Sequence, residues 1–361
     1  MDLGPDRLYF GVNPPEEETA SPQDFLLSCR QAGAGIYPLP TSFLTETNLS
    51  DTSREEELSR LLREQIETAE TLLPAGAPLF PVISPEPQTA FSCGAFEEVY
   101  MDLLEKYTAA KSAGADGAIC AERDRLWVMR SAVLAAKTAR LPLILFLQTD
   151  EDGTSESGTD ALAALLTLQS LGAAAFGVAA PEGCAGEIIR RLFPHADIPL
   201  CVLSSEQDFP AAVSAGAGIL LSATLPAFGA LMPERFPPSP PRPAEIDSYG
   251  AAVECEAFFL PEDLVLSDPL PCSYSLSDAL IDCDDDNINT IVISLRSSDD
   301  AAILAENSTM TRLPLTVTAD DANTLEAALR YFSGRLLVDS GCDIDRSELM
   351  RLCSAYGAIL Y

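Results

Sequence analysis

The sequence contains very little histidine and few basic side chains. His195 is the only histidine in 361 residues, which nearly excludes a His-based triad and a metal site built from several imidazoles. The 22 lysines and arginines face 55 aspartates and glutamates, for a formal net charge of −33. Such a surface repels phosphate backbones and anionic lipids, so we expect neither nucleic acid nor a membrane as a partner. The surplus charge predicts solubility, with an acidic docking face for a basic partner as the alternative.

The chain also lacks long apolar runs and closely spaced cysteines. No apolar run reaches the roughly 18 residues of a membrane span, and the first residues, MDLGPDRLYF, resemble no secretion signal. We therefore expect a cytoplasmic protein. The ten cysteines are never closer than eleven positions, so there is no Cys-x-x-Cys knuckle or redox pair, and we expect buried, reduced thiols.

Eight short apolar runs recur along the first part of the chain, each followed by a polar loop and a helical pattern. Runs that are apolar on both faces are typical of parallel strands covered by helices. The helical pattern is clearest at 54–73 and 96–114, where apolar residues recur at i, i+3 and i+4. Eight such units predict an α/β fold with a closed (β/α)8 or TIM barrel. The predicted strands are 7–12, 34–40, 79–84, 117–121, 142–147, 174–179, 199–204 and 218–223.

A proline-rich stretch, MPERFPPSPPRPAEI (232–246), follows the predicted barrel. Six prolines in fifteen residues, without helical or strand periodicity, indicate a stiff linker. We therefore predict a barrel at 1–231, a linker at 232–249 and a smaller α/β domain at 250–361. Five strands are too few for a second closed barrel, so this domain is predicted to be an open sheet or a truncated barrel. Its predicted strands are 254–260, 290–295, 313–319, 334–340 and 357–361.

The loop QTDEDGTSESGTD (148–160) is long for a connection between a strand and a helix. It follows the fifth predicted strand and so belongs to the C-terminal rim, where barrels of this class bind their substrates. Thr159 or Asp160 is placed to cap the helix that follows. Capping needs only a few residues, so the extra length indicates a binding loop. His195 precedes the seventh strand, at the opposite end of the barrel, and we expect it on the surface.

Residues 133–178, VLAAKTARLPLILFLQTDEDGTSESGTDALAALLTLQSLGAAAFGV, resemble the homocysteine S-methyltransferase family. The barrel of that family forms the N-terminal part of cobalamin-dependent methionine synthases and has a D-G-x-T-x-x-G-T loop after the same strand. Residues 96–117 and 30–43 resemble its matching helices and second strand, so the resemblance covers roughly residues 24–225. Residues 313–361 more weakly resemble the first half of the pterin (folate) barrel that follows in those enzymes.

The resemblance implies a zinc site whose ligands this sequence does not carry. Members of the family hold zinc with three cysteines, and the zinc keeps the homocysteine thiol ionised; a free thiol of pKa about 8.5 is mostly protonated at neutral pH. Here Ala180 stands at the first ligand position, and Ala223 and Thr224 stand at or beside the other two. A glutamate that usually ends the fourth strand is replaced by Ala121, with Glu122 beside it. We therefore predict no zinc and no other cofactor.

Our first hypothesis is a degenerate member of this family, a pseudoenzyme that acts as a binding or partner module without zinc-dependent methyl transfer. Its rim would bind homocysteine or another small amino acid, or a protein of a corrinoid or folate methyl-transfer system connected with methionine biosynthesis. The candidate substrate-binding residues are Thr41, Glu122, Asp152 and Thr159.

Two alternatives stay open, so the sequence does not decide whether the chain is an enzyme. The first is an active homocysteine S-methyltransferase with relocated zinc ligands near the strand ends, for which the candidates are Cys93, Cys120 and Cys184. The second is an unrelated barrel enzyme that uses carboxylates of the rim, for which the candidates are Glu122, Asp150 and Asp152.

Overall fold

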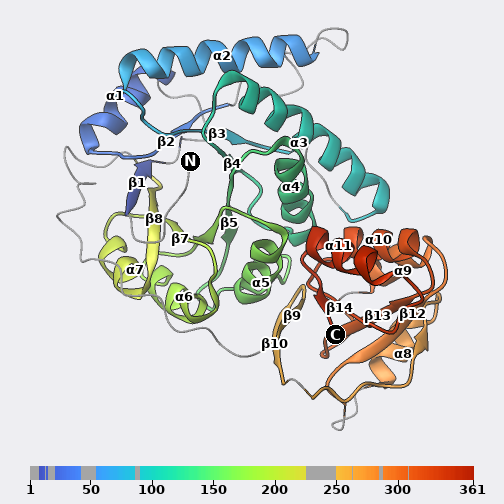
Figure 1. The fold of residues 1–361 in the computed structure, drawn as a ribbon. Coiled ribbons are helices and arrows are strands. Elements are labelled where there is room, and N and C mark those ends of the chain that lie inside the picture. The colour runs from blue at the N-terminus through green and yellow to red at the C-terminus, as the bar shows by residue number, and fades with distance from the viewer. Residues whose placement is uncertain are drawn as a thin grey trace.

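The computed structural model describes residues 8–12, 14, 21–41, 54–85, 90–224, 249–261, 263–283, 288–307 and 309–361. The predicted linker, 232–249, lies outside these residues except for Tyr249. Figure 1 shows a ring of alternating strands and helices, with a smaller sheet and its helices beside it. Within the described ranges, no helix is long and apolar enough to cross a membrane.

The first part of the chain is a (β/α)8 barrel, which confirms the predicted fold class. Its eight strands are parallel, in the order β1-β8-β7-β6-β5-β4-β3-β2. The ring closes where the carbonyl of Phe10 accepts the N–H groups of Gly35 and Ile36, at 2.8 and 3.0 Å. Each predicted apolar run overlaps one strand: β1 (Tyr9–Val12), β2 (Tyr37–Leu39), β3 (Leu79–Ile83), β4 (Ala118–Cys120), β5 (Leu143–Gln148), β6 (Ala175–Ala179), β7 (Leu200–Ser204) and β8 (Ala217–Ser222).

Among the described residues, seven α-helices surround the strands, and their apolar faces pack against the outside of the ring. In α2, Leu58, Leu62 and Ile66 recur four residues apart and are fully or almost fully buried. Gly114, Gly172 and Gly216 end three helices in the left-handed conformation that favours glycine, as the sequence predicts. The helices are α1 (Pro22–Ala32), α2 (Arg54–Leu72), α3 (Cys93–Ala113), α4 (Leu126–Ala139), α5 (Ala161–Leu171), α6 (Ala185–Leu192) and α7 (Phe209–Ala215), with a short 3-10 helix at Phe193–His195.

The interior of the barrel is filled with side chains. Ile144 and Phe146 of β5 point inward, whereas the alternate residues Leu145 and Leu147 pack against the helices. At Gly177 of β6 a Cβ atom would lie 1.8 Å from the backbone oxygen of Cys201, so β6 and β7 approach too closely for any side chain there. The interior cluster consists of Tyr9, Ile36, Phe80, Ile119, Ile144, Phe146, Ala175, Cys201, Leu203, Ile219 and Leu221.

The C-terminal part contains a second, open parallel sheet, in the order β11-β12-β13-β14-β15. In β12, Ile291, Ile293 and Leu295 belong to the core beneath the helices. Four of the five predicted strands overlap strands of this sheet, and the short edge strand β11 was not predicted. The elements are β11 (Leu270–Pro271), α8 (Leu276–Asp282), β12 (Ile291–Leu295), α9 (Asp300–Glu306), β13 (Leu315–Ala319), α10 (Ala322–Tyr331), β14 (Leu337–Val338), α11 (Arg346–Tyr356) and β15 (Ile359–Leu360).

The predicted strand at 254–260 is wrong in its first two residues, because a turn at Glu254 and Cys255 separates two antiparallel strands. These are β9 (Tyr249–Val253) and β10 (Glu256–Leu260). Ala251 and Leu260 of this hairpin pack on Leu337 and Ile359 of the C-terminal sheet. In Figure 1 the hairpin lies between α5 and that sheet, and Gly250 packs on Leu166 of α5.

A buried arginine joins the barrel to the C-terminal part. Arg130 of α4 is 2 % exposed and donates to the carbonyl oxygens of Gly334 and Leu329, both at 2.8 Å. Closer to the surface, Arg330 donates to both carboxylate oxygens of Glu97, at 2.6 and 2.9 Å. The two sheets are therefore connected by contacts between α4, α3 and α10 as well as by the chain.

Candidate functional site

The C-terminal rim of the barrel is described at the loops after β4, β5, β6 and β7. The loops that follow β1, β2, β3 and β8 lie largely outside the described residues. The predicted binding loop after β5 is therefore the main part of the rim whose contacts can be followed.

This loop is organised by its own carboxylates. Asp150 accepts the backbone N–H groups of Asp152 and Thr154 through Oδ1, at 3.0 and 2.9 Å. Asp160 caps α5 by accepting from Leu162 and Ala163, which confirms the predicted cap. The side chain of Asp152 is exposed. Asp150 and Asp160 thus hold the loop in shape, and Asp152 points to solvent.

The loop after β4 is bound tightly to the loop after β5. The carbonyl oxygen of Asp124 accepts the hydroxyls of Ser155 and Ser157 at 3.2 and 2.9 Å. The carboxylate of Asp124 accepts the N–H of Ser157 at 3.0 Å. Thr159 is fully buried and lies 3.3 Å from the Ser157 hydroxyl. The two loops therefore form one hydrogen-bonded unit, which we call the rim unit (residues 121–125 and 149–160).

A side chain that sequence reasoning missed completes the rim unit. Glu254, in the turn of the β9–β10 hairpin, accepts the hydroxyl of Thr159 at 3.3 Å. Burial raises the pKa of the Glu254 carboxyl to about 6; the Thr159 hydrogen bond lowers this pKa, and the nearby Asp124 raises it. No sequence pattern indicates this contact, because the two residues are 95 positions apart.

Two further candidates also make contacts within the scaffold. Glu122 accepts the backbone N–H groups of Asp124 and Arg125 at 2.9 and 3.2 Å, so it shapes the turn that leads into α4. Thr41, after β2, donates to the carbonyl of Val82 on β3. Thr41 and Glu122 are thus each bonded to the backbone of the scaffold, Asp152 is exposed, and Thr159 is buried.

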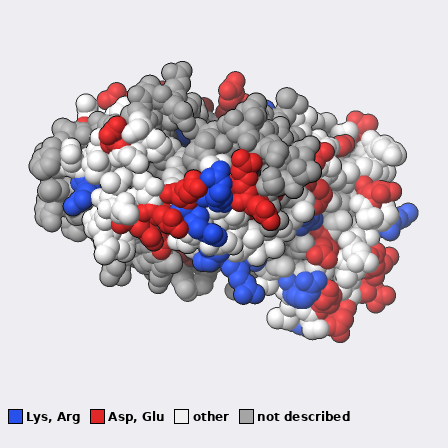
Figure 2. Space-filling model, turned by 90° about the horizontal axis from the view of Figure 1, so that it is seen from above, with Lys and Arg blue, Asp and Glu red and all other residues white. Residues whose placement is uncertain are grey.

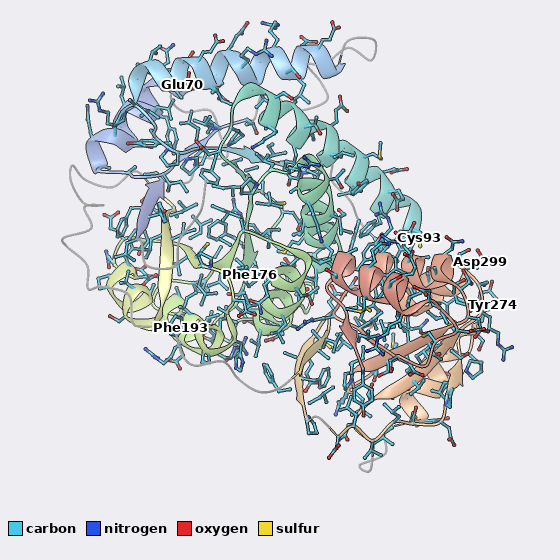
Figure 3. The ribbon with its side chains drawn as sticks, in the orientation of Figure 1. Glu70, Cys93, Phe176, Phe193, Tyr274 and Asp299 are labelled. Carbon is cyan, nitrogen blue, oxygen red and sulfur yellow. The ribbon has the colours of Figure 1, made fainter. Side chains whose placement is uncertain are left out.

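The three cysteines proposed as relocated zinc ligands lie in different surroundings. Cys93 begins α3, and Figure 3 places it next to the C-terminal part, where Glu306 is a charged neighbour. Cys120 faces the helix layer, since it belongs to the outer core and contacts Tyr107 of α3; burial raises its pKa to about 12. Cys184 immediately precedes α6. Among the described residues no group of three or more His, Cys, Asp or Glu side chains could hold a metal.

The family's zinc does not fit the residues that stand at its ligand positions. Ala180, after β6, packs its methyl group on the core, and Ala223 is exposed beyond β8. Thr224 is exposed as well and accepts the Ser222 hydroxyl through its carbonyl at 2.7 Å. Two methyl groups and a hydroxyl cannot replace three thiolates as zinc ligands. No step of chemistry is therefore assigned to zinc.

At the ends of β5 and β7, the mouth of the barrel presents neutral polar side chains. By alternation along β5 and β7, Gln148 and Ser205 follow the inward-facing Phe146 and Leu203. Gln148 is exposed, and the Ser205 hydroxyl is buried without a hydrogen-bond partner. Asp208 accepts the Ser204 hydroxyl and the N–H of Gly183. Gln148 and Ser205 thus offer neutral hydrogen-bonding groups at these two strand ends.

Acidic and basic side chains lie side by side on the face seen from above in Figure 2. Figure 2 shows acidic side chains spread across the face seen from above, with small groups of lysine and arginine among them. His195 is partly buried, and its ring stacks on Phe259 of β10 with centroids 4.2 Å apart. Burial lowers the pKa of His195. This residue was expected on the surface, and its ring packs against the hairpin.

No protein-family model and no curated protein matches the chain. Solved structures do resemble it. The apo form of homocysteine methyltransferase MmuM from Escherichia coli is 16 % identical, with a TM-score of 0.48 over 60 % of this chain and 90 % of that one. Its oxidized form is 18 % identical, with a TM-score of 0.47 over 59 % and 83 %. A putative phosphonomutase from Burkholderia cenocepacia is 14 % identical, with a TM-score of 0.40 over 61 % and 88 %. Identities this low concern the barrel fold alone.

Proposed function

We propose that this chain is a degenerate relative of the homocysteine S-methyltransferases whose rim binds a ligand or partner without zinc-dependent methyl transfer. The ligand class is homocysteine or another small amino acid, and the partner class is a protein of a corrinoid or folate methyl-transfer system. Residues 1–231 would correspond to the homocysteine S-methyltransferase barrel, and residues 250–361 to the first half of a pterin-binding barrel.

The observation that carries this proposal is that carboxylates of the rim are hydrogen-bonded to the backbone of the loops. Glu122, Asp124, Asp150 and Asp208 each accept backbone N–H groups of the loops in which they lie or of a neighbouring loop. A general acid or base must face its substrate and exchange a proton with it. Carboxylates bound in this way stabilise turns, so they favour a scaffold role over the role of a carboxylate enzyme.

The ligand positions of the family support the same proposal. A substrate thiol near Ala180, Ala223 and Thr224 meets no soft donor that could hold a metal beside it. At neutral pH such a thiol stays mostly protonated and is a weak nucleophile. The neutral groups at the mouth, Gln148 and Ser205, could still bind the polar end of an amino acid.

Zinc content and homocysteine binding test the proposal on the full-length chain. After incubation with equimolar zinc and gel filtration, we expect much less than one zinc per chain. A calorimetric titration with L-homocysteine should give the same affinity with and without zinc. Cys120→Ser and Cys184→Ser serve as matched variants. One zinc per chain in the wild type, lost in either variant, would establish an active enzyme with relocated ligands.

A second experiment addresses the protein partner. Native mass spectrometry of the chain with a purified corrinoid methyltransferase domain should show a one-to-one complex. Asp152→Lys reverses an exposed charge on the rim loop and should weaken that complex, whereas Glu348→Lys, on the exposed face of α11, should not. A chain that stays monomeric and binds neither homocysteine nor the domain would contradict the proposal.

A further inference from the structure

The turn of the β9–β10 hairpin is bound to the rim unit at two points. The backbone carbonyl of Glu254 accepts the N–H of Asp160 at 3.2 Å, at the start of α5. The Glu254 carboxylate accepts the Thr159 hydroxyl at 3.3 Å. Thr159 is fully buried, so this contact is shielded from solvent. A segment of the C-terminal part thus holds the end of the predicted binding loop.

The charged groups that act on this carboxyl and on the adjacent Cys255 are acidic. Asp124, from the loop before α4, is the charged neighbour that acts on Glu254. Asp160 at the start of α5 and Glu256 on the hairpin act on the adjacent Cys255. The basic side chain of Arg191, on α6, pairs with Asp160 at 2.7 Å. An ionised Glu254 therefore lies partly buried beside another acid, with one hydroxyl as its donor.

We propose that the hairpin turn and the rim unit form an acid-closed latch, in which protonation of Glu254 fastens the turn to the loop and ionisation loosens it. A neutral carboxyl escapes desolvation of its charge and repulsion by Asp124, and together these outweigh the hydrogen bond from Thr159, which favours the ionised form. The ionised form must be desolvated beside Asp124, and burial accordingly places its pKa at about 6. The latch would be closed in mildly acidic conditions and loosened at neutral pH, which controls access to the loop.

The latch rests on the proposed function only for the identity of the ligand that the loop binds. The movement itself depends on Glu254, Thr159 and Asp124, none of which enters the zinc and homocysteine measurements. If the chain proves to be an active zinc enzyme, the latch can still be present. If the latch is absent, the homocysteine titration still tests whether the chain binds an amino acid.

Hydrogen–deuterium exchange of the full-length chain tests the latch. Exchange of residues 149–160 and 250–257, normalised to the intrinsic chemical rate, is compared at pH 5.0, 6.0 and 7.5. A pKa raised from 4.5 to about 6 makes opening roughly tenfold more frequent at pH 7.5 than at pH 5.0. Helix α2, on the far side of the barrel, is the internal reference.

Three variants separate the latch from general effects of pH. Glu254→Gln should remove most of the pH dependence and keep the loop protected throughout. Asp124→Asn keeps an oxygen for the Ser157 N–H and should move the midpoint to lower pH. Glu256→Gln, at an exposed position of the same hairpin, should behave as the wild type. Equal pH dependence in the wild type and Glu254→Gln, or exchange that does not vary with pH, would overturn the latch.

Discussion

Replacing Arg130 with alanine is the most direct test of how the two parts of the chain hold together. The guanidinium is almost fully buried between α4 and α10 and donates to two backbone carbonyls. Its Nε has no hydrogen-bond partner. Burial lowers its pKa to about 9, so the group still carries its charge at neutral pH.

The expected loss follows from these contacts. A hydrogen bond from a charged donor contributes about 1.5–3 kcal/mol, so two contribute roughly 3–6 kcal/mol. Removing the charge also removes the cost of burying it, whereas the two carbonyls lose their donors and a cavity is left. We therefore expect Arg130→Ala to lower the free energy of unfolding by about 3–5 kcal/mol.

The assay is urea unfolding at pH 7.5, followed by the fluorescence of Trp127. This residue is the only tryptophan and lies buried on the same helix. Lys137→Ala is the matched control, because Lys137 is exposed, also lies on α4 and makes a single bond to the carbonyl of Ala355 at 2.8 Å. It should cost less than about 1 kcal/mol.

A loss below about 1 kcal/mol in Arg130→Ala would refute this reasoning. It would mean that the cost of burying the charge cancels its two hydrogen bonds. Arg130→Met distinguishes that case, since it keeps most of the volume without the charge and would then be as stable as the wild type.

Three further predictions concern the rim and the barrel interior. Burial raises the pKa of Glu254 from 4.5 to about 6, so the protonated side chain contributes its full stability below pH 4.5, and this contribution is lost as the pH rises through 6. Glu254→Gln should therefore raise the free energy of unfolding by up to roughly 2 kcal/mol at pH 8 and leave it unchanged near pH 4. Urea unfolding at both pH values measures this difference. A gain in the free energy of unfolding near pH 4 alone would show that the predicted direction of the pH dependence is wrong. Gly177→Ala places a Cβ 1.8 Å from the backbone of β7 and should lower the melting temperature by at least 8 °C, whereas Gly35→Ala, with no atom within 4 Å, should shift it by less than about 3 °C. Equal shifts would contradict the close approach of the strands. The thiol of Cys120 is buried with a pKa of about 12 and should react with a disulfide reagent at pH 7.5 only after unfolding, whereas the exposed Cys255 should be modified in the folded chain, as peptide mass mapping would reveal. Early labelling of Cys120 would show that α3 opens locally.

The barrel was predictable because its strands are buried on both faces. The run PLILFL, for example, has no polar residue to interrupt it, and β5 (Leu143–Gln148) occupies it almost fully. The helix ends were also predictable where glycine or aspartate is required, as at Gly172 and Asp160. These signals are local, since each depends on a few neighbouring residues.

The hairpin was not predictable from the same signals. Its first strand, YGAAV, was not predicted, since Tyr249 was assigned to the linker and the other four residues to no element, and its turn contains neither glycine nor proline. The roles of Glu254 and Arg130 depend on contacts with residues 95 to 204 positions away. Thr159 was proposed to bind substrate, and the structure instead shows it buried against the hairpin. Long-range contacts of this kind leave no periodic pattern in the sequence.

The last strand of the small sheet has a consequence for how the chain can be divided. Residues beside β15 lie against the barrel: a Cβ on Gly357 would come within 2.6 Å of the Ser170 backbone in α5. Arg335 ties Gly357 to Gly250 of the hairpin at 2.9 and 2.8 Å. A fragment cut within the proline-rich stretch would lose the contact with α5. The edge strand β15 and the apolar surface beside it would then be exposed and suited to self-association. The smaller sheet is therefore protected by the barrel, and expression trials that separate the two parts should yield aggregates of the smaller one.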